Sequence, residues 1–112
     1  MANRPITIEG INSDNALILS DRGRTIANPG DTVTWLIGNQ SGVEAITSID
    51  AKAGSPNVFN PDPGPVGGST NWRGTIDPNI SDDQEEDYSI GYTKTSGGSF
   101  SFDPKIQVSP SR

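Results

Sequence analysis

The chain has 112 residues, no histidine, no cysteine and a single methionine at position 1, with a formal net charge of −6 at pH 7. Soft and borderline transition metals are bound through imidazole, thiolate or thioether groups, so a metal centre of that kind is excluded. The acidic balance argues against nucleic acid and anionic membranes as partners, because both are bound mainly through lysine and arginine. The length predicts one domain over residues 1–112.

The start of the sequence lacks the apolar run of a signal peptide, and no stretch approaches the roughly 20 apolar residues that cross a bilayer as a helix. The expected location is therefore the cytoplasm. If the sequence is the trimmed mature form of a longer chain, secretion is expected instead. The lack of cysteine is compatible with either compartment.

Short stretches of alternating apolar residues are separated by thirteen glycines and nine prolines. Such alternation is typical of strands with one buried face. It predicts an all-β chain folded as a two-sheet Greek-key sandwich of seven to eight strands. The predicted strands cover residues 5–10, 17–19, 32–37, 43–49, 70–76, 86–93, 99–102 and 105–108.

Three features interrupt this pattern. Pro104 cannot donate to a sheet ladder, which predicts a bulge, an edge or a break between the last two strands. A single helical turn is expected at most, over residues 80–84, where Ser81 suits an N-cap. The long irregular stretch 54–69 fits either a binding loop or a cover for the edge of a sandwich.

One set of motifs carries a family resemblance. The turn Asn-Pro-Gly-Asp at 28–31 leads into Thr-Val-Thr-Trp at 32–35, and Tyr-x-Ile-x-Tyr at 88–92 precedes a final strand at 105–108. This order of motifs resembles the cupredoxin family, although similar turns also open strands in immunoglobulin-like modules. The resemblance implies a core that includes Val33, Trp35, Tyr88, Ile90 and Val108.

The resemblance does not extend to the copper ligands. In cupredoxins the segment after the tryptophan strand supplies a histidine, and the loop between the last two strands supplies cysteine, histidine and usually methionine. Here these places hold Gly-Asn-Gln-Ser-Gly-Val-Glu at 38–44 and Tyr-Thr-Lys-Thr-Ser-Gly-Gly-Ser at 92–99. Copper electron transfer is therefore not implied, and we expect no metal, no cofactor and no catalytic residue.

The densest group of charges is the acidic run 82–87, with Asp77 shortly before it. Carboxylate oxygens are the ligands that calcium takes, which makes Asp82 and Asp83 candidate contacts. A run of acids before a strand is more often a solvated turn that protects the strand from edge pairing. A second, weaker acidic group combines Asp62 with Asp50 or Asp103.

Trp72 stands at the exit of the long irregular stretch, near several asparagines. An exposed indole stacking on a sugar, with Asn57, Asn60 and Asn71 as hydrogen-bonding groups, would make a lectin-like site. A tryptophan at the start of a strand in a small sandwich is more often a plug for the core. The candidate ligand contacts are Asn57, Asn71, Trp72, Asp82 and Asp83.

Catalysis is not expected, because histidine and cysteine are missing and no nucleotide-binding or hydrolase motif is present. The expected function is a non-catalytic, non-copper module that binds a protein partner or a second copy of itself. The glycine-rich segments 38–42 and 96–99 are the predicted docking place. The alternatives are a carbohydrate-binding, calcium-assisted lectin and a structural self-assembling subunit.

Overall fold

The computed structural model describes residues 3–14, 16–60, 62–80 and 84–108. Within these ranges the chain forms ten strands and no helix. The strands are β1 (Asn3–Ile11), β2 (Leu17–Leu19), β3 (Arg24–Ala27), β4 (Thr32–Ile37), β5 (Val43–Ala51), β6 (Gly64–Pro65), β7 (Trp72–Thr75), β8 (Glu85–Lys94), β9 (Ser99–Phe102) and β10 (Lys105–Val108). The predicted all-β class is confirmed.

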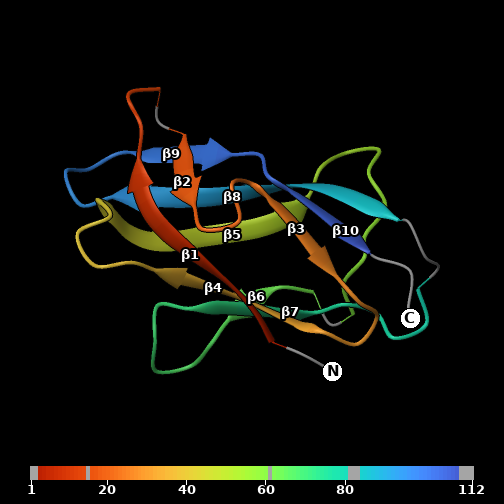
Figure 1. Cartoon of the computed structure of the whole chain (residues 1–112). Coiled ribbons are helices and arrows are strands. Elements are labelled where there is room, and N and C mark those ends of the chain that lie inside the picture. The colour runs from red at the N-terminus through yellow and green to blue at the C-terminus, as the bar shows by residue number, and fades with distance from the viewer. Residues whose placement is uncertain (1–2, 15, 61, 81–83, 109–112) are drawn as a thin grey trace.

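The strands form two sheets that face each other as a sandwich (Figure 1). The first sheet has the order β2-β1-β4-β7-β6. The second has the order β3-β10-β8-β5, with β9 also paired to β8. Pairing is parallel between β1 and β4 and between β3 and β10, and antiparallel elsewhere. The chain changes sheet between β2 and β3, so these two consecutive strands each form an open edge.

Two of the ten strands lie outside the sequence prediction. The inward side chains of β3 are Thr25 and Ala27, which are buried but carry no strong apolar signal. Strand β6 is only two residues long and contains Pro65, which is tolerated because the strand lies at an edge. Both strands are therefore made by their neighbours rather than by their own composition.

Strand β8 is the central strand of the second sheet and pairs with three others. Its residues 85–87 pair with β10 and its residues 90–93 pair with β9, while β5 lies along the other side. The predicted break falls between β9 and β10, where Tyr88 N donates to Pro104 O over 3.2 Å. Pro104 thus interrupts one long strand without removing it from the sheet.

The core lies between the sheets and is centred on Trp35. Its ring lies 5.7 Å from the ring of Phe59 and 5.8 Å from that of Tyr88, and its Nε1 donates to the Tyr88 hydroxyl over 3.2 Å. All five residues that the resemblance placed in the core are fully buried. In β2 the two leucines point inward and Ile18 points outward.

The described part of the stretch 54–69 covers one side of the sandwich. Val58 and Phe59 are buried in the core, and Phe59 bridges to Ile76 just after β7. Of the two interpretations, cover for a sandwich edge therefore describes this part of the stretch. The helical turn expected at 80–84 falls largely on residues 81–83, which lie outside the described ranges.

Candidate functional site: an acidic cavity and a cluster of turns

A carboxyl group lies in the apolar inner face of β8. Side chains alternate along a strand, so Glu86, Tyr88, Ile90 and Tyr92 all point the same way, and all four are buried. Only 2% of Glu86 is exposed. A charged residue buried to this extent is rare and calls for hydrogen-bond partners.

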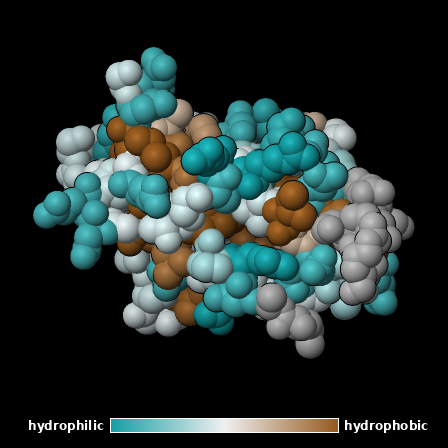
Figure 2. Space-filling model, in the orientation of Figure 1, coloured by the Kyte–Doolittle hydropathy of each residue, from teal (hydrophilic) through white to brown (hydrophobic). Residues whose placement is uncertain are grey.

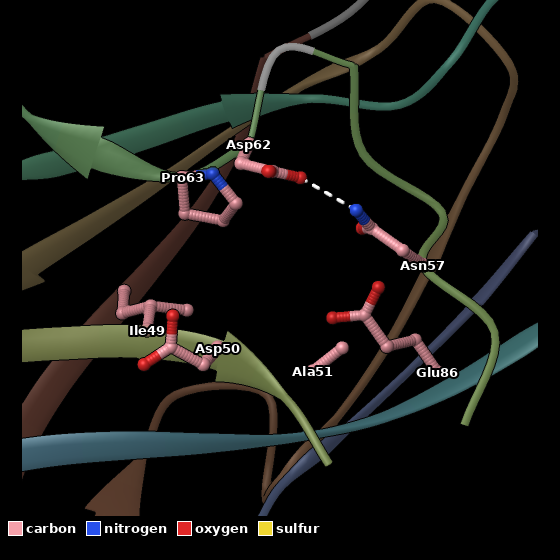
Figure 3. A pocket seen from close by; sticks show the side chains of 7 residues that line it. All are labelled: Ile49, Asp50, Ala51, Asn57, Asp62, Pro63 and Glu86. Atoms are coloured by element: carbon pink, nitrogen blue, oxygen red, sulfur yellow. Dashed lines mark hydrogen bonds between the residues drawn. The ribbon is translucent and has the colours of Figure 1, made fainter. Parts of the chain in front are cut away.

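Glu86 receives one such bond and faces a cavity. Its Oε1 accepts a hydrogen bond from Val58 N over 2.8 Å, which joins β8 to a segment 28 positions away in the sequence. Figure 3 shows the carboxyl directed into a cavity of about 90 Å³. The cavity is lined by Ile49, Asp50, Ala51, Asn57, Asp62, Pro63 and Glu86.

The buried environment shifts the pKa of Glu86. Burial raises the pKa of Glu86 from 4.5 to about 7, because a low-dielectric site disfavours the charged form. The hydrogen bond from Val58 N lowers the pKa, and the negative charge of Asp62 raises it further. Glu86 therefore exchanges its proton near neutral pH.

The other polar groups of the cavity are exposed. Asn57 Nδ2 donates to Asp62 Oδ1 over 2.6 Å, and Asn57 Oδ1 accepts from Phe59 N over 3.0 Å. Asp50 lies on the exposed face of β5. Across the residues that the structure describes, no group of three or more His, Cys, Asp or Glu side chains is arranged to hold a metal ion.

The second acidic group predicted from sequence is divided by the fold. Asp50 and Asp62 line the same cavity. Asp103 lies elsewhere, where its carboxylate accepts from Ser89 Oγ over 2.7 Å and from Lys52 Nζ over 3.1 Å. These two bonds lower the pKa of Asp103, which fits a surface ion pair.

The acidic run 82–87 is not one continuous face. Glu85 points outward toward Arg24 and Lys105, at 3.8 and 4.0 Å, whereas Glu86 points into the cavity. The two candidate contacts Asp82 and Asp83 lie outside the described residues. The interpretation of the run as a solvated turn therefore fails for Glu86, because its position on β8 places it on the inner face.

The lectin-like constellation is spread along β7. Trp72 is partly buried, packs against the core and is in register with Trp35 on β4, and Asn71 precedes it. Asn57 lies beyond the other end of β7, since the neighbouring Val58 O accepts a hydrogen bond from Asp77 N, two residues after that strand. Five residues of strand span about 16 Å, so Asn57 and Trp72 do not converge. Trp72 thus fits the core-plug interpretation.

Two turns meet at the end of the sandwich away from Glu86. Thr95 N donates to Gly42 O over 3.0 Å, which joins the turn 38–42 to the turn 95–98. A Cβ added at Gly42 would lie 3.5 Å from Cδ1 of Ile11, the last residue of β1. Figure 1 shows the turns 38–42 and 95–98 at the same end of the sandwich. The two segments predicted as a docking place are therefore adjacent.

Sequence reasoning did not single out Glu86. The available signal was its position in the alternation with Tyr88, Ile90 and Tyr92, which places it on the buried face. The surrounding acids hid this signal, because a run of charges normally indicates solvent exposure.

Comparison with known proteins adds no family. Neither the protein-family models nor the curated proteins contain a match to this chain. In the described ranges there is also no helix with the length and apolar character needed to cross a membrane.

Proposed function

We propose that this chain is a non-catalytic, non-copper, cupredoxin-like β-sandwich that binds a protein partner through the turns 38–42 and 95–98. The observation that supports the proposal is the convergence of these two turns, held together by the hydrogen bond from Thr95 N to Gly42 O. Loops fixed on a rigid sheet scaffold are where binding residues are concentrated in such folds. The partner that purified protein can test is a second copy of the chain.

The turns are suited to present a defined surface. Gln40, Gly42, Gly97 and Gly98 all have positive φ values, between 60° and 104°, so the backbone at these positions is in a conformation that few residues adopt. The surface is polar, because Asn39, Gln40 and residues 95–99 are exposed. Its backbone and amide groups suit hydrogen bonds to a partner rather than an apolar interface.

The rest of the described surface shows fewer features of a binding site. The large hydrophobic side chains that are exposed there are Ile18 and Ile26, one on each of two edge strands. On the face shown in Figure 2, polar side chains separate the apolar areas from one another. Single exposed isoleucines are normal on soluble proteins, so Ile26 serves as a comparison site.

We expect the wild-type protein to associate with itself as its concentration rises, and the double variant Gln40→Glu/Ser96→Glu to associate at least about tenfold more weakly. In a symmetric dimer each copy would bring both new carboxylates to the interface, where like charges repel. Sedimentation velocity or light scattering over a dilution series measures the association. Circular dichroism checks that the variants keep the fold.

Two matched variants locate the interface. Asn79→Glu adds a carboxylate in the turn after β7, and Ile26→Lys adds a charge to the edge strand β3. Both are expected to associate like the wild type. Association abolished by Ile26→Lys alone, or a wild-type chain that stays monomeric at every concentration, contradicts the proposal. Binding on a glycan array that is lost with a chelator would favour the lectin alternative.

A further inference from the structure

Residues 55–60, called the strap here, connect the two sheets at the end of β8 opposite the turns. On the β8 side, Val58 N donates to Glu86 Oε1 and Asp87 N donates to Ser55 Oγ, each over 2.8 Å. On the β7 side, the strap is bonded through Asp77 N to Val58 O over 2.9 Å and through Asn60 N to Thr75 O over 2.8 Å. The strap therefore closes the side of the sandwich.

The Glu86 bond is the one contact of the strap that contains a buried ionisable group. Oε1 of Glu86 is bonded to Val58 N, and the carboxyl borders a cavity of about 90 Å³ (Figure 3). That volume corresponds to about three water molecules. There is therefore room for water beside the carboxyl.

The charged groups among the residues that line the cavity are all acidic. Asp50 borders the cavity from the exposed face of β5 and Asp62 borders it from the segment after the strap, and neither lysine nor arginine is among the described lining residues. On β8 itself the nearest inward neighbour is Tyr88, whose hydroxyl also experiences the charge of Asp21. The residue opposite Glu86 on β10 is the apolar Ile106. Ionisation of Glu86 therefore adds a negative charge that no cation among the described cavity-lining residues compensates.

We propose that the strap is a pH-sensitive latch, which stays closed while Glu86 carries a proton and opens more readily once Glu86 ionises in its buried position beside Asp62. The hydrogen bond from Val58 N favours the ionised carboxylate, but burial opposes ionisation more strongly, and the charge of Asp62 adds to that opposition. An open strap lets the carboxylate reach water. This latch is separate from the turns of the proposed function, at the other end of β8.

Opening of the strap changes the surface of the molecule. Val58 and Phe59, which are 0% and 4% exposed, leave the core when the strap opens. The exposed end of β5 and the gap between the sheets become accessible at the same time. Because burying these two side chains is favourable, the open form remains a minority at neutral pH, and the pH sets how large that minority is.

Hydrogen exchange of the full-length protein, followed by NMR, tests the latch. The protection factors of the Val58 and Asp77 amides, corrected for intrinsic exchange, are expected to fall roughly 70-fold between about pH 5 and about pH 8. Amides paired between β1 and β4 are expected to be more protected at every pH. Exchange of the strap amides should be insensitive to low urea, because a local opening exposes little surface.

Three variants test whether ionisation of Glu86 causes the pH dependence of the strap protection. In Glu86→Gln, which keeps an acceptor for Val58 N but does not titrate, the strap protection is expected to be independent of pH. In Asp62→Asn the fall is expected to shift to lower pH, since one repelling charge is gone. Glu85→Gln, the matched change at the exposed neighbouring position, is expected to behave like the wild type.

Two results overturn the latch. One is a strap whose amides share the protection and urea dependence of the β1–β4 amides, since the strap then opens only when the whole domain unfolds. The other is a pH dependence that persists in Glu86→Gln. A failure of self-association leaves both of these results unchanged, so the latch and the proposed function are tested separately.

Discussion

Replacing Trp35 with alanine is expected to lower the free energy of unfolding by about 3–5 kcal/mol, the usual cost of removing a large aromatic side chain from a packed core. Trp35 is fully buried and contacts the rings of Phe59 and Tyr88. The change also removes the donor to the Tyr88 hydroxyl, which is left buried without that bond. Domains of this size are stable by only about 5–15 kcal/mol, so much of the stability is lost. Urea denaturation followed by far-UV circular dichroism measures it.

Trp72→Ala is the matched control. Trp72 is directly opposite Trp35 on β7 but is only partly buried at the edge of the core. Its removal is expected to cost about 1–2 kcal/mol, because less apolar area returns to water. Equal losses in the two variants would show that the sandwich is not centred on Trp35.

Glu86→Gln is expected to make the protein more stable than the wild type above about pH 7, by at most about 3 kcal/mol. The pKa of Glu86 is raised from 4.5 to about 7 in the folded state. The folded protein therefore holds this proton more tightly than the unfolded chain does. The stability linked to Glu86 is complete below about pH 4.5 and is lost as the pH rises through about 7. Urea denaturation at a series of pH values measures the effect.

The contribution of Glu86 must be obtained by comparing the pH dependence of stability of the wild type with that of the variant, because the wild-type curve contains other titrating groups. The lowered pKa of Asp103 acts in the opposite direction, because its stabilising ion pair is lost as the pH falls. Subtracting the Glu86→Gln profile from the wild-type profile isolates the contribution of Glu86. Glu85→Gln is the control, and its profile should differ little from that of the wild type, since exposed ion pairs contribute little. A wild-type stability that does not fall relative to Glu86→Gln between these pH values contradicts the expectation.

The alternation of apolar residues was enough to predict the main strands and their inward faces. In β8 the spacing of Tyr88, Ile90 and Tyr92 identified the buried side, and in β4 the same was true of Val33 and Trp35. The signal is reliable there because a strand with one buried face repeats every two residues. It failed for β3, whose inward Thr25 and Ala27 are too small or too polar to stand out.

The candidate site was predictable only in part. Asp50 and Asp62 were paired in advance, and the structure places both on one cavity. The third member, Glu86, was hidden within a run of acids, and its partner Val58 comes from a segment with no strand pattern of its own. Asn57 and Trp72 were grouped as one site, but the structure places them at opposite ends of β7.

The sequence by itself determined that neither histidine nor cysteine is available as a metal ligand, and which side of each long strand faces inward, because residue types and the two-residue period are local properties. The tertiary structure alone decided that Glu86 meets Val58 and lies beside Asp62. These contacts join segments more than twenty positions apart, and only the packing of one sheet against the other brings them together. The raised pKa of Glu86 follows from that packing, since burial is a property of the folded chain.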